Sequence, residues 1–112
     1  LTSLGGRRVI KDYSIIGSSK AALESMIRYI AAEFGPSGIR ANAISPGVVD
    51  TEALDYFPDK DEMIRTTLER TPLGRLVTPE DIAELAVFLC SERSQMITGE
   101  VINIDGGYSN SG

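Results

Sequence analysis

Apolar side chains recur at the spacing of a helix over residues 14–34 of this 112-residue chain. Gly35 and Pro36 follow directly, and residues of these two types commonly end a helix. The apolar positions of this segment are Ile16, Ala21, Leu23, Met26, Ile27, Ile30, Ala31 and Phe34. The sequence therefore predicts one long helix with two apolar faces.

The rest of the chain alternates between strand-like and helix-like segments. Residues 1–3, 39–45 and 99–104 have the composition of strands, and the last two end at Pro46-Gly47 and Asp105-Gly106-Gly107. Polar residues 60–69 and apolar residues 81–90 have helical spacing. This order predicts an α/β fold in which helices cover both faces of a parallel sheet.

Thr78 and Pro79 mark the start of the last helix. A threonine followed by proline and two acidic residues, Glu80 and Asp81, combines a cap, a favoured first residue and charges that suit a helix N-terminus. We therefore expect a sharply defined start before residue 81.

Three strands alone would leave sheet edges and apolar helix faces uncovered. The chain is therefore predicted to be about half of a single domain. Ligands of such a parallel sheet bind beyond the carboxyl ends of its strands. Ser3, the Pro46-Gly47 turn and the Asp105-Gly106-Gly107 turn are expected at that rim.

Composition excludes several classes of function. The net charge is −5 and basic residues form no run, which argues against a nucleic-acid or anionic membrane partner. No apolar run approaches the roughly 20 residues of a membrane span. The absence of histidine argues against a zinc site and a hydrolase triad. The one cysteine, Cys90, lies in an apolar run and is predicted to be buried. We expect the protein to be cytoplasmic.

Tyr13 and Lys20 are the pair of residues best suited to chemistry. Seven residues are close to two helical turns, so two helical side chains at this spacing share a face and lie roughly 10 Å apart along the axis. An ammonium group near a phenol stabilises the phenolate and favours proton transfer. The alternative is that Tyr13 packs against the protein and Lys20 is solvated.

Four ordered segments resemble the carboxyl-terminal part of the short-chain dehydrogenase/reductase family: residues 2–5, Tyr13 with residues 20–23, residues 39–51 and residues 104–107. The resemblance covers essentially the whole chain, and it implies that residues 1–112 are the carboxyl-terminal half of a doubly wound, Rossmann-like parallel sheet. It implies that Lys20 holds the nicotinamide ribose, that Tyr13 protonates the substrate oxygen and that Ser3 supports it. It also implies that the cofactor lies along Pro46, Gly47, Val49 and Thr51.

The chain departs from the commonest pattern of that family, which has tyrosine four residues before the lysine. Ile16 stands there, and the tyrosine is at Tyr13, as in the enoyl-acyl-carrier-protein reductases, especially the NADPH-dependent type of Bacillus. Ser3 falls where other family members keep a catalytic serine and other enoyl reductases an aromatic residue. The resemblance implies reduction of an enoyl thioester in fatty acid synthesis, with NADPH or NADH and with acyl-carrier protein or coenzyme A as carrier.

Residues 52–75 are predicted to form a lid over the substrate. The segment has loop composition and then a polar helix with a thin apolar stripe. Its apolar residues could line an acyl channel or pack the lid against the body, and they are Leu54, Phe57, Met63, Ile64 and Leu68.

The sequence has no glycine-rich phosphate-binding loop after a strand. In the family that loop belongs to the amino-terminal half, so we expect residues 1–112 alone to show no NADPH oxidation with a crotonyl thioester. Two alternatives remain: a 3-ketoacyl or alcohol reductase of the same family, and an inactive fragment with a role in assembly. The resemblance implies a homotetramer, for which Met26, Ile30 and the last residues are candidates.

Overall fold

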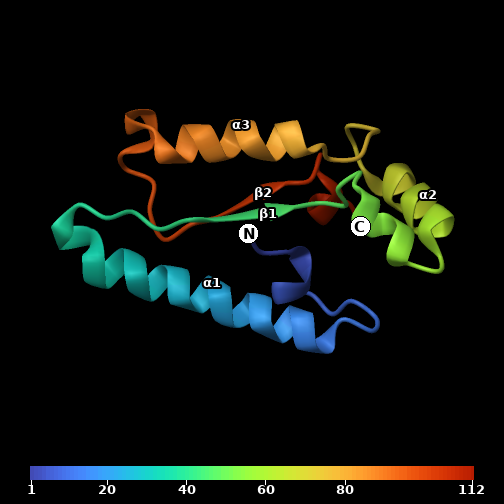
Figure 1. Cartoon of the computed structure of the whole chain (residues 1–112), viewed down its shortest axis with the longest axis horizontal. Helices are drawn as coiled ribbons and strands as arrows, with labels where there is room; N and C mark the ends of the chain where they lie inside the picture. The colour runs from blue at the N-terminus through green and yellow to red at the C-terminus, as the bar shows by residue number, and fades with distance from the viewer.

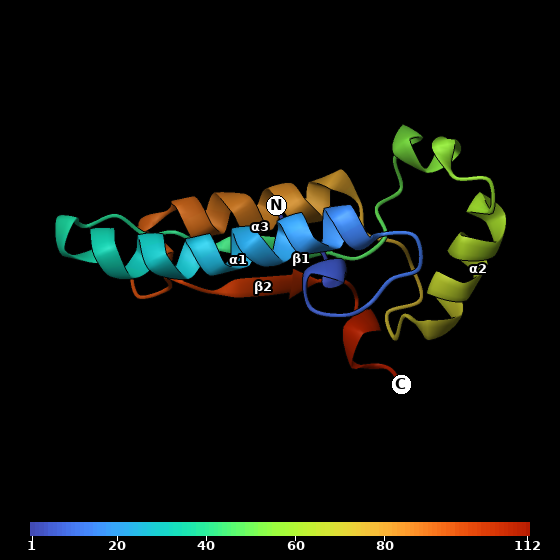
Figure 2. The same cartoon turned by 90° about the horizontal axis from the view of Figure 1, so that it is seen from below.

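The computed structural model describes all residues from Leu1 to Gly112. Two parallel strands, β1 (Ala43–Pro46) and β2 (Val101–Ile104), pair from Ala43 opposite Val101 to Pro46 opposite Ile104. Helix α1 (Ser14–Phe34) covers one face of the pair and α3 (Pro79–Cys90) the other, whereas α2 (Lys60–Arg70) lies beyond one end (Figures 1 and 2). The predicted α/β architecture with helices on both faces is confirmed.

The amino-terminal segment lies along the free side of β1. The Thr2 amide donates to the Ile44 carbonyl at 2.8 Å, and Thr2 is only 3% exposed. The segment was predicted to be a strand, but it makes this one backbone bond to β1 and has no regular strand geometry. It nevertheless places Ser3 next to the carboxyl end of β1.

Both predicted strands are shorter than the sequence indicates. Residues 39–42 and 99–100 lie outside β1 and β2, because their polar groups form irregular bonds with one another. The Gly99 amide donates to the Ala41 carbonyl, and the Glu100 amide donates to the Asn42 side chain. The strands begin only where this set of contacts ends.

The helices agree closely with their predicted bounds. Helix α1 spans residues 14–34 as expected, α2 ends one residue later than predicted, and α3 begins at Pro79 with a capping box between Thr78 and Asp81. The left-handed residue after α1 is Gly38, with φ 78°, whereas Gly35 stays right-handed. None of the helices combines the length and apolar character needed to cross a bilayer.

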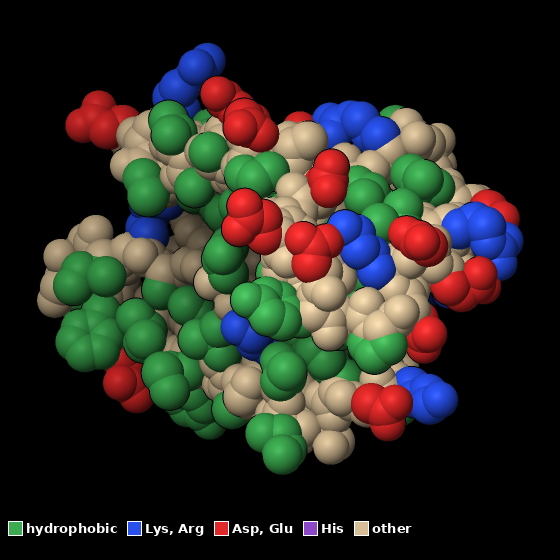
Figure 3. Space-filling view, turned by 45° about the vertical axis from the view of Figure 1, so that its right-hand side comes forward, with side chains coloured by type: hydrophobic (Ala, Val, Ile, Leu, Met, Phe, Trp, Pro, Cys, Tyr) green, Lys and Arg blue, Asp and Glu red, His purple; other side chains and the backbone are tan.

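The buried core is small, with 14 of 112 residues buried, so much apolar surface remains exposed. The prediction that Cys90 is buried is wrong: α3 buries Leu89 alone, and Cys90, which follows it, is exposed. The buried apolar residues are Ala31, Ala43, Ile44, Leu54, Val77 and Leu89. Apolar side chains gather in one region of the surface in Figure 3, and charges of both signs are spread over the rest.

Candidate active site

Tyr13 lies just before α1, because its carbonyl accepts the first helical bond, from the Gly17 amide at 2.7 Å. Tyr13 is therefore the cap residue of α1, which agrees with the predicted start of the helix at residue 14. Its hydroxyl is 3.3 Å from the Ser3 hydroxyl, and both residues are half-buried. The structure thus joins two of the three predicted catalytic residues by a hydrogen bond.

Lys20 reaches the same segment from the second turn of α1. Its ammonium donates to the Leu1 carbonyl at 3.1 Å, two residues before Ser3. Two residues of extended chain span about 7 Å. Tyr13 and Lys20 are therefore anchored close together on one short segment beside the sheet.

Two glycines allow this close approach. A Cβ atom on Gly17 would lie 2.7 Å from the Gly5 carbonyl oxygen, and one on Gly5 would lie 2.5 Å from the Tyr13 ring. The loop that carries Ser3 therefore packs directly on the first turn of α1. This packing sets the position of the phenol.

Glu24 is a buried residue of the site that the sequence reasoning missed. It is 4% exposed and accepts a hydrogen bond from the Thr2 hydroxyl at 2.7 Å, while its other oxygen is 3.6 Å from Arg7 Nε. The Arg7 guanidinium also donates to Asn103 of β2 at 2.6 Å. Glu24 follows Lys20 by four residues, and this spacing puts both side chains on one face of the helix. That spacing was the sequence feature from which Glu24 could have been found.

The turn after β1 lies against the turn after β2, as predicted for the rim. The Gly47 amide donates to the Ile104 carbonyl, and a Cβ atom on Gly47 would lie 3.1 Å from Asp105 Cβ. Gly47 does not adopt the left-handed conformation. The close approach of Asp105, and not a special backbone angle, therefore favours glycine at this position. Pro46 is the last residue of β1, so the strand ends one residue later than its predicted end at residue 45.

Val49 keeps its backbone groups available. The residues on either side of it bond to Val77, since the Val77 amide donates to the Val48 carbonyl and the Asp50 amide donates to the Val77 carbonyl. The N–H and C=O of Val49 take part in neither bond. Thr51 is exposed just before the next turn of helix.

The carboxylate of Asp105 organises the turn after β2. It accepts hydrogen bonds from the Gly107 amide at 2.9 Å and the Ser109 amide at 3.0 Å. Partial burial raises the pKa of Asp105, but the bonds from Ser109 and Gly107 outweigh burial and hold that pKa below its usual value. Gly106 and Gly107 adopt left-handed conformations, with φ of 62° and 90°. The predicted turn is confirmed.

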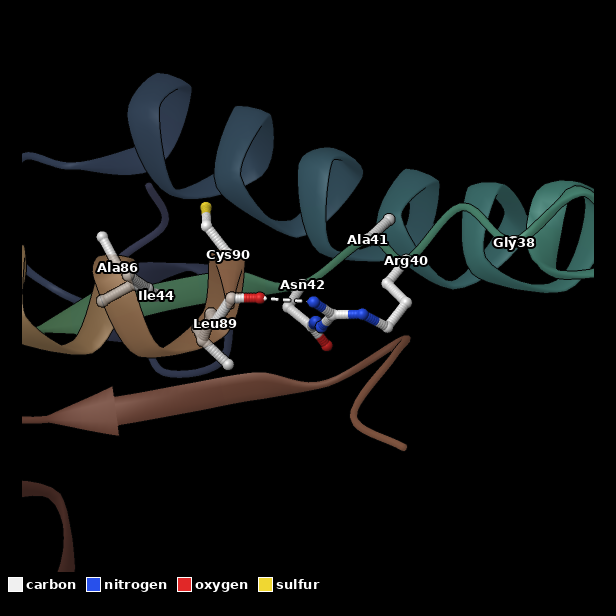
Figure 4. Close-up of a pocket in the computed structure, with 8 residues that line it drawn as sticks. All are labelled: Gly38, Arg40, Ala41, Asn42, Ile44, Ala86, Leu89 and Cys90. Carbon is white, nitrogen blue, oxygen red and sulfur yellow. Dashed lines mark hydrogen bonds between the residues drawn. The ribbon is translucent and has the colours of Figure 1, made fainter. Parts of the chain in front are cut away.

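A cavity of about 480 Å³ lies at the opposite end of the sheet, between the start of β1 and the end of α3. Figure 4 shows Arg40 directed across it, where its guanidinium donates to the Leu89 carbonyl at 2.8 Å. Arg40 also donates to the Ser91 carbonyl, so it satisfies the end of α3. None of the predicted catalytic or cofactor-binding residues lines this cavity.

Known proteins match the chain over nearly its whole length. A family described as Enoyl-(Acyl carrier protein) reductase matches residues 1–109. The enoyl-acyl-carrier-protein reductase of Bacillus cereus named FabI, an NADH enzyme by that name, is 44% identical over 108 residues. This match covers 96% of the chain but 42% of the relative, so the chain spans less than half the relative's length.

Solved structures give the same relationship. The crystal structure of the Bacillus cereus enoyl-acyl carrier protein reductase with NADP+ and indole naphthyridinone superposes with a TM-score of 0.93 at 42% identity, over 99% of this chain and 43% of that one. A 7α-hydroxysteroid dehydrogenase complexed with NADH and 7-oxo glycochenodeoxycholic acid superposes with a TM-score of 0.88 at 35% identity, over 96% of this chain and 42% of that one.

Proposed function

Because the chain belongs to the enoyl-acyl-carrier-protein reductase family of short-chain dehydrogenases/reductases, we propose that it is the carboxyl-terminal catalytic part of such a reductase. The reaction is reduction of the double bond of an enoyl thioester in fatty acid synthesis. The observation that carries this proposal is the attachment of Tyr13 and Lys20 to residues 1–3 at the rim of the sheet.

Tyr13 acts as the proton donor in this proposal. Reduction at the β carbon of the thioester places negative charge on the thioester oxygen, which a positioned hydroxyl can stabilise. The Ser3 hydroxyl, 3.3 Å from the phenol, holds the Tyr13 hydroxyl in place. Lys20 supports the same region with its positive charge.

The residues at the rim fit a nicotinamide cofactor, which when bound supplies the hydride. Lys20 uses one of its three donors within the chain, so it can also bind a ribose hydroxyl. The unused N–H and C=O of Val49 suit a carboxamide, and Thr51 offers an exposed hydroxyl to the phosphates. Pro46 and Gly47 set the course of this segment.

NADPH is the cofactor that we propose, with NADH as the alternative. The printed names of the Bacillus cereus proteins support both, since FabI is named for NADH and the crystal structure contains NADP+. Initial rates with each cofactor at equal concentration decide between them.

Residues 52–75 are proposed as the substrate lid. Leu54 is buried, whereas Phe57 is 51% and Leu68 37% exposed, so the side chains of Phe57 and Leu68 are accessible to an acyl chain. Met63 and Ile64 are half-buried. The acyl group is delivered on acyl-carrier protein or coenzyme A.

The test uses the intact reductase that contains this chain. Tyr13→Phe is expected to lower kcat for a crotonyl thioester by about two orders of magnitude or more, because it removes the proton donor. Tyr29→Phe, an exposed tyrosine of α1, is the matched control and should keep the wild-type rate. The readout is NADPH oxidation, and full activity of Tyr13→Phe would overturn the proposal.

A ketone or alcohol reductase is the second candidate, and the similarity to the hydroxysteroid dehydrogenase favours it. Faster turnover of an acetoacetyl thioester than of a crotonyl thioester would select it. The third candidate is an inactive assembly element, which would reduce neither substrate.

Assembly into a homotetramer is proposed through α1 and the last residues. Met26 of α1 is 56% exposed and available for such a contact, whereas Ile30 is half-buried. The proposed compartment is the cytoplasm, whose reducing conditions suit the free, exposed thiol of Cys90.

A further inference from the structure

Two arginines that are far apart in sequence hold the short segment after β2. We call Tyr108–Ser111 the tail bracket; its first three residues form a single helical turn. Arg8, from the loop before Tyr13, donates to the Ser109 carbonyl at 2.7 Å. Arg70, the last residue of α2, donates to the Tyr108 hydroxyl at 3.3 Å and to the Ser111 carbonyl at 3.4 Å. The tail bracket thus connects the Tyr13 loop with α2.

Arg70 is held by stacking as well as by hydrogen bonds. Its guanidinium carbon is 4.8 Å from the centre of the Tyr108 ring, within the range of a cation–π contact. The Ser111 hydroxyl donates back to the Arg70 carbonyl at 2.5 Å. Arg70 Nε is buried without a partner, which carries a cost in free energy.

The tail bracket is itself tied firmly to the sheet. Ser109 is 7% exposed, its amide donates to Asp105, and its hydroxyl accepts from the Asn103 side chain at 3.3 Å. The bracket therefore gives Arg70 a rigid partner.

Helix α2 has few other attachments. Thr67 is its one buried residue, and at its first turn Lys60 pairs with Asp55 of the same lid segment. Figure 2 shows α2 projecting beyond the sheet, with the tail below its last turn. The tie to the sheet is made at the carboxyl end of α2, where Thr71 also packs on Gly106.

We propose that the tail bracket fixes α2 relative to the Tyr13 loop, and that Arg70 and Tyr108 are positioning residues for the acyl substrate. The substrate part of this inference rests on the proposed function. The mechanical part, that α2 is held through Tyr108, rests on the contacts alone.

The kinetic test compares Tyr108→Leu with Tyr108→Phe in the intact reductase. The leucine removes the ring that faces Arg70, and the phenylalanine keeps it. Tyr108→Leu should raise KM for the enoyl thioester roughly fivefold, with kcat and the KM for the cofactor within about twofold of wild type. Tyr108→Phe should have a KM for the enoyl thioester within about twofold of the wild-type value. An unchanged KM in Tyr108→Leu would overturn the substrate-positioning role.

Hydrogen exchange supplies a readout that needs no substrate. Amides of residues 60–70 should exchange at least about fivefold faster in Tyr108→Leu and in Arg70→Gln, while amides of α1 keep their wild-type rates. Unchanged exchange in α2, or equal acceleration of α1 and α2, would overturn the inference. If wild type reduces no enoyl thioester but α2 loosens as expected, the proposed function and the substrate role fail and the mechanical tie stands.

Discussion

Gly17 shows how one atom decides the geometry of the site. In an exposed helix interior, alanine is favoured over glycine by about 1 kcal/mol. At Gly17, however, the added Cβ atom would lie 2.7 Å from the Gly5 carbonyl oxygen, a backbone atom that cannot move alone. This contact therefore makes glycine more favourable than alanine at position 17.

Gly17→Ala is expected to destabilise the intact reductase by about 1–2 kcal/mol, since overpacking costs more than helix propensity returns. It should also lower activity, because the displaced loop carries Ser3. The matched control is Gly35→Ala, where φ is −52° and no atom lies within 4 Å of the added Cβ, so stability should stay equal or rise. Chemical denaturation measures the free energy of unfolding of both variants, and equal values for the two would contradict the packing argument.

At this scale the sequence proposes candidate catalytic residues more readily than the residues that position them. Tyr13, Lys20 and Ser3 could be named from motif and spacing, and the structure brings all three to one segment. Glu24 could not be assigned, because its role depends on Thr2 and Arg7, which approach it only in the folded chain.

Among the elements, α3 has the clearest local determinants. Thr78 accepts from the Asp81 amide, and the Asp81 carboxylate accepts from the Thr78 amide at 2.9 Å and pairs with Arg75 at 2.6 Å. The hydrogen bonds from Arg75 and Thr78 hold the pKa of Asp81 well below its usual value. Charged Asp81 is therefore favoured in the folded chain.

The sign of the pH effect follows from this lowered pKa. The ionised carboxylate stabilises the fold above the unfolded pKa of about 3.9, and the stabilisation is lost as the pH falls from there through the folded pKa. Asp81→Asn should therefore lower Tm most at neutral pH, and the difference from wild type should shrink between about pH 4 and pH 2. Glu80→Gln, an exposed neighbour, is the control. A difference that grows toward acid would contradict this account.

Helix bounds were more predictable than strand bounds for a physical reason. Helical bonds join near neighbours, and caps such as Thr78 lie in the local sequence. The start of β1 depends instead on distant partners, since the Asn42 side chain donates to the Ile97 carbonyl and the Ala41 amide donates to the Thr98 hydroxyl. Local patterns carry no information about such contacts.

The whole molecule is more open than a compact domain of its length. Its radius of gyration is 15.1 Å, whereas a compact chain of this size has about 13 Å. Large apolar side chains such as Ile15, Tyr29 and Val87 are 67–86% exposed. This exposed apolar surface is available for contact with further protein. The expectation that residues 1–112 alone are inactive stays a prediction.

The central claim is that Tyr13 and Lys20 face one reduced nicotinamide and one thioester. A crystal structure of the intact reductase with cofactor and an enoyl thioester tests it most directly. The account predicts that the Tyr13 hydroxyl lies within hydrogen-bond distance of the thioester oxygen, or one water away, and that the Lys20 ammonium binds the ribose. A phenol more distant than that, or a Lys20 directed into another region, would contradict it.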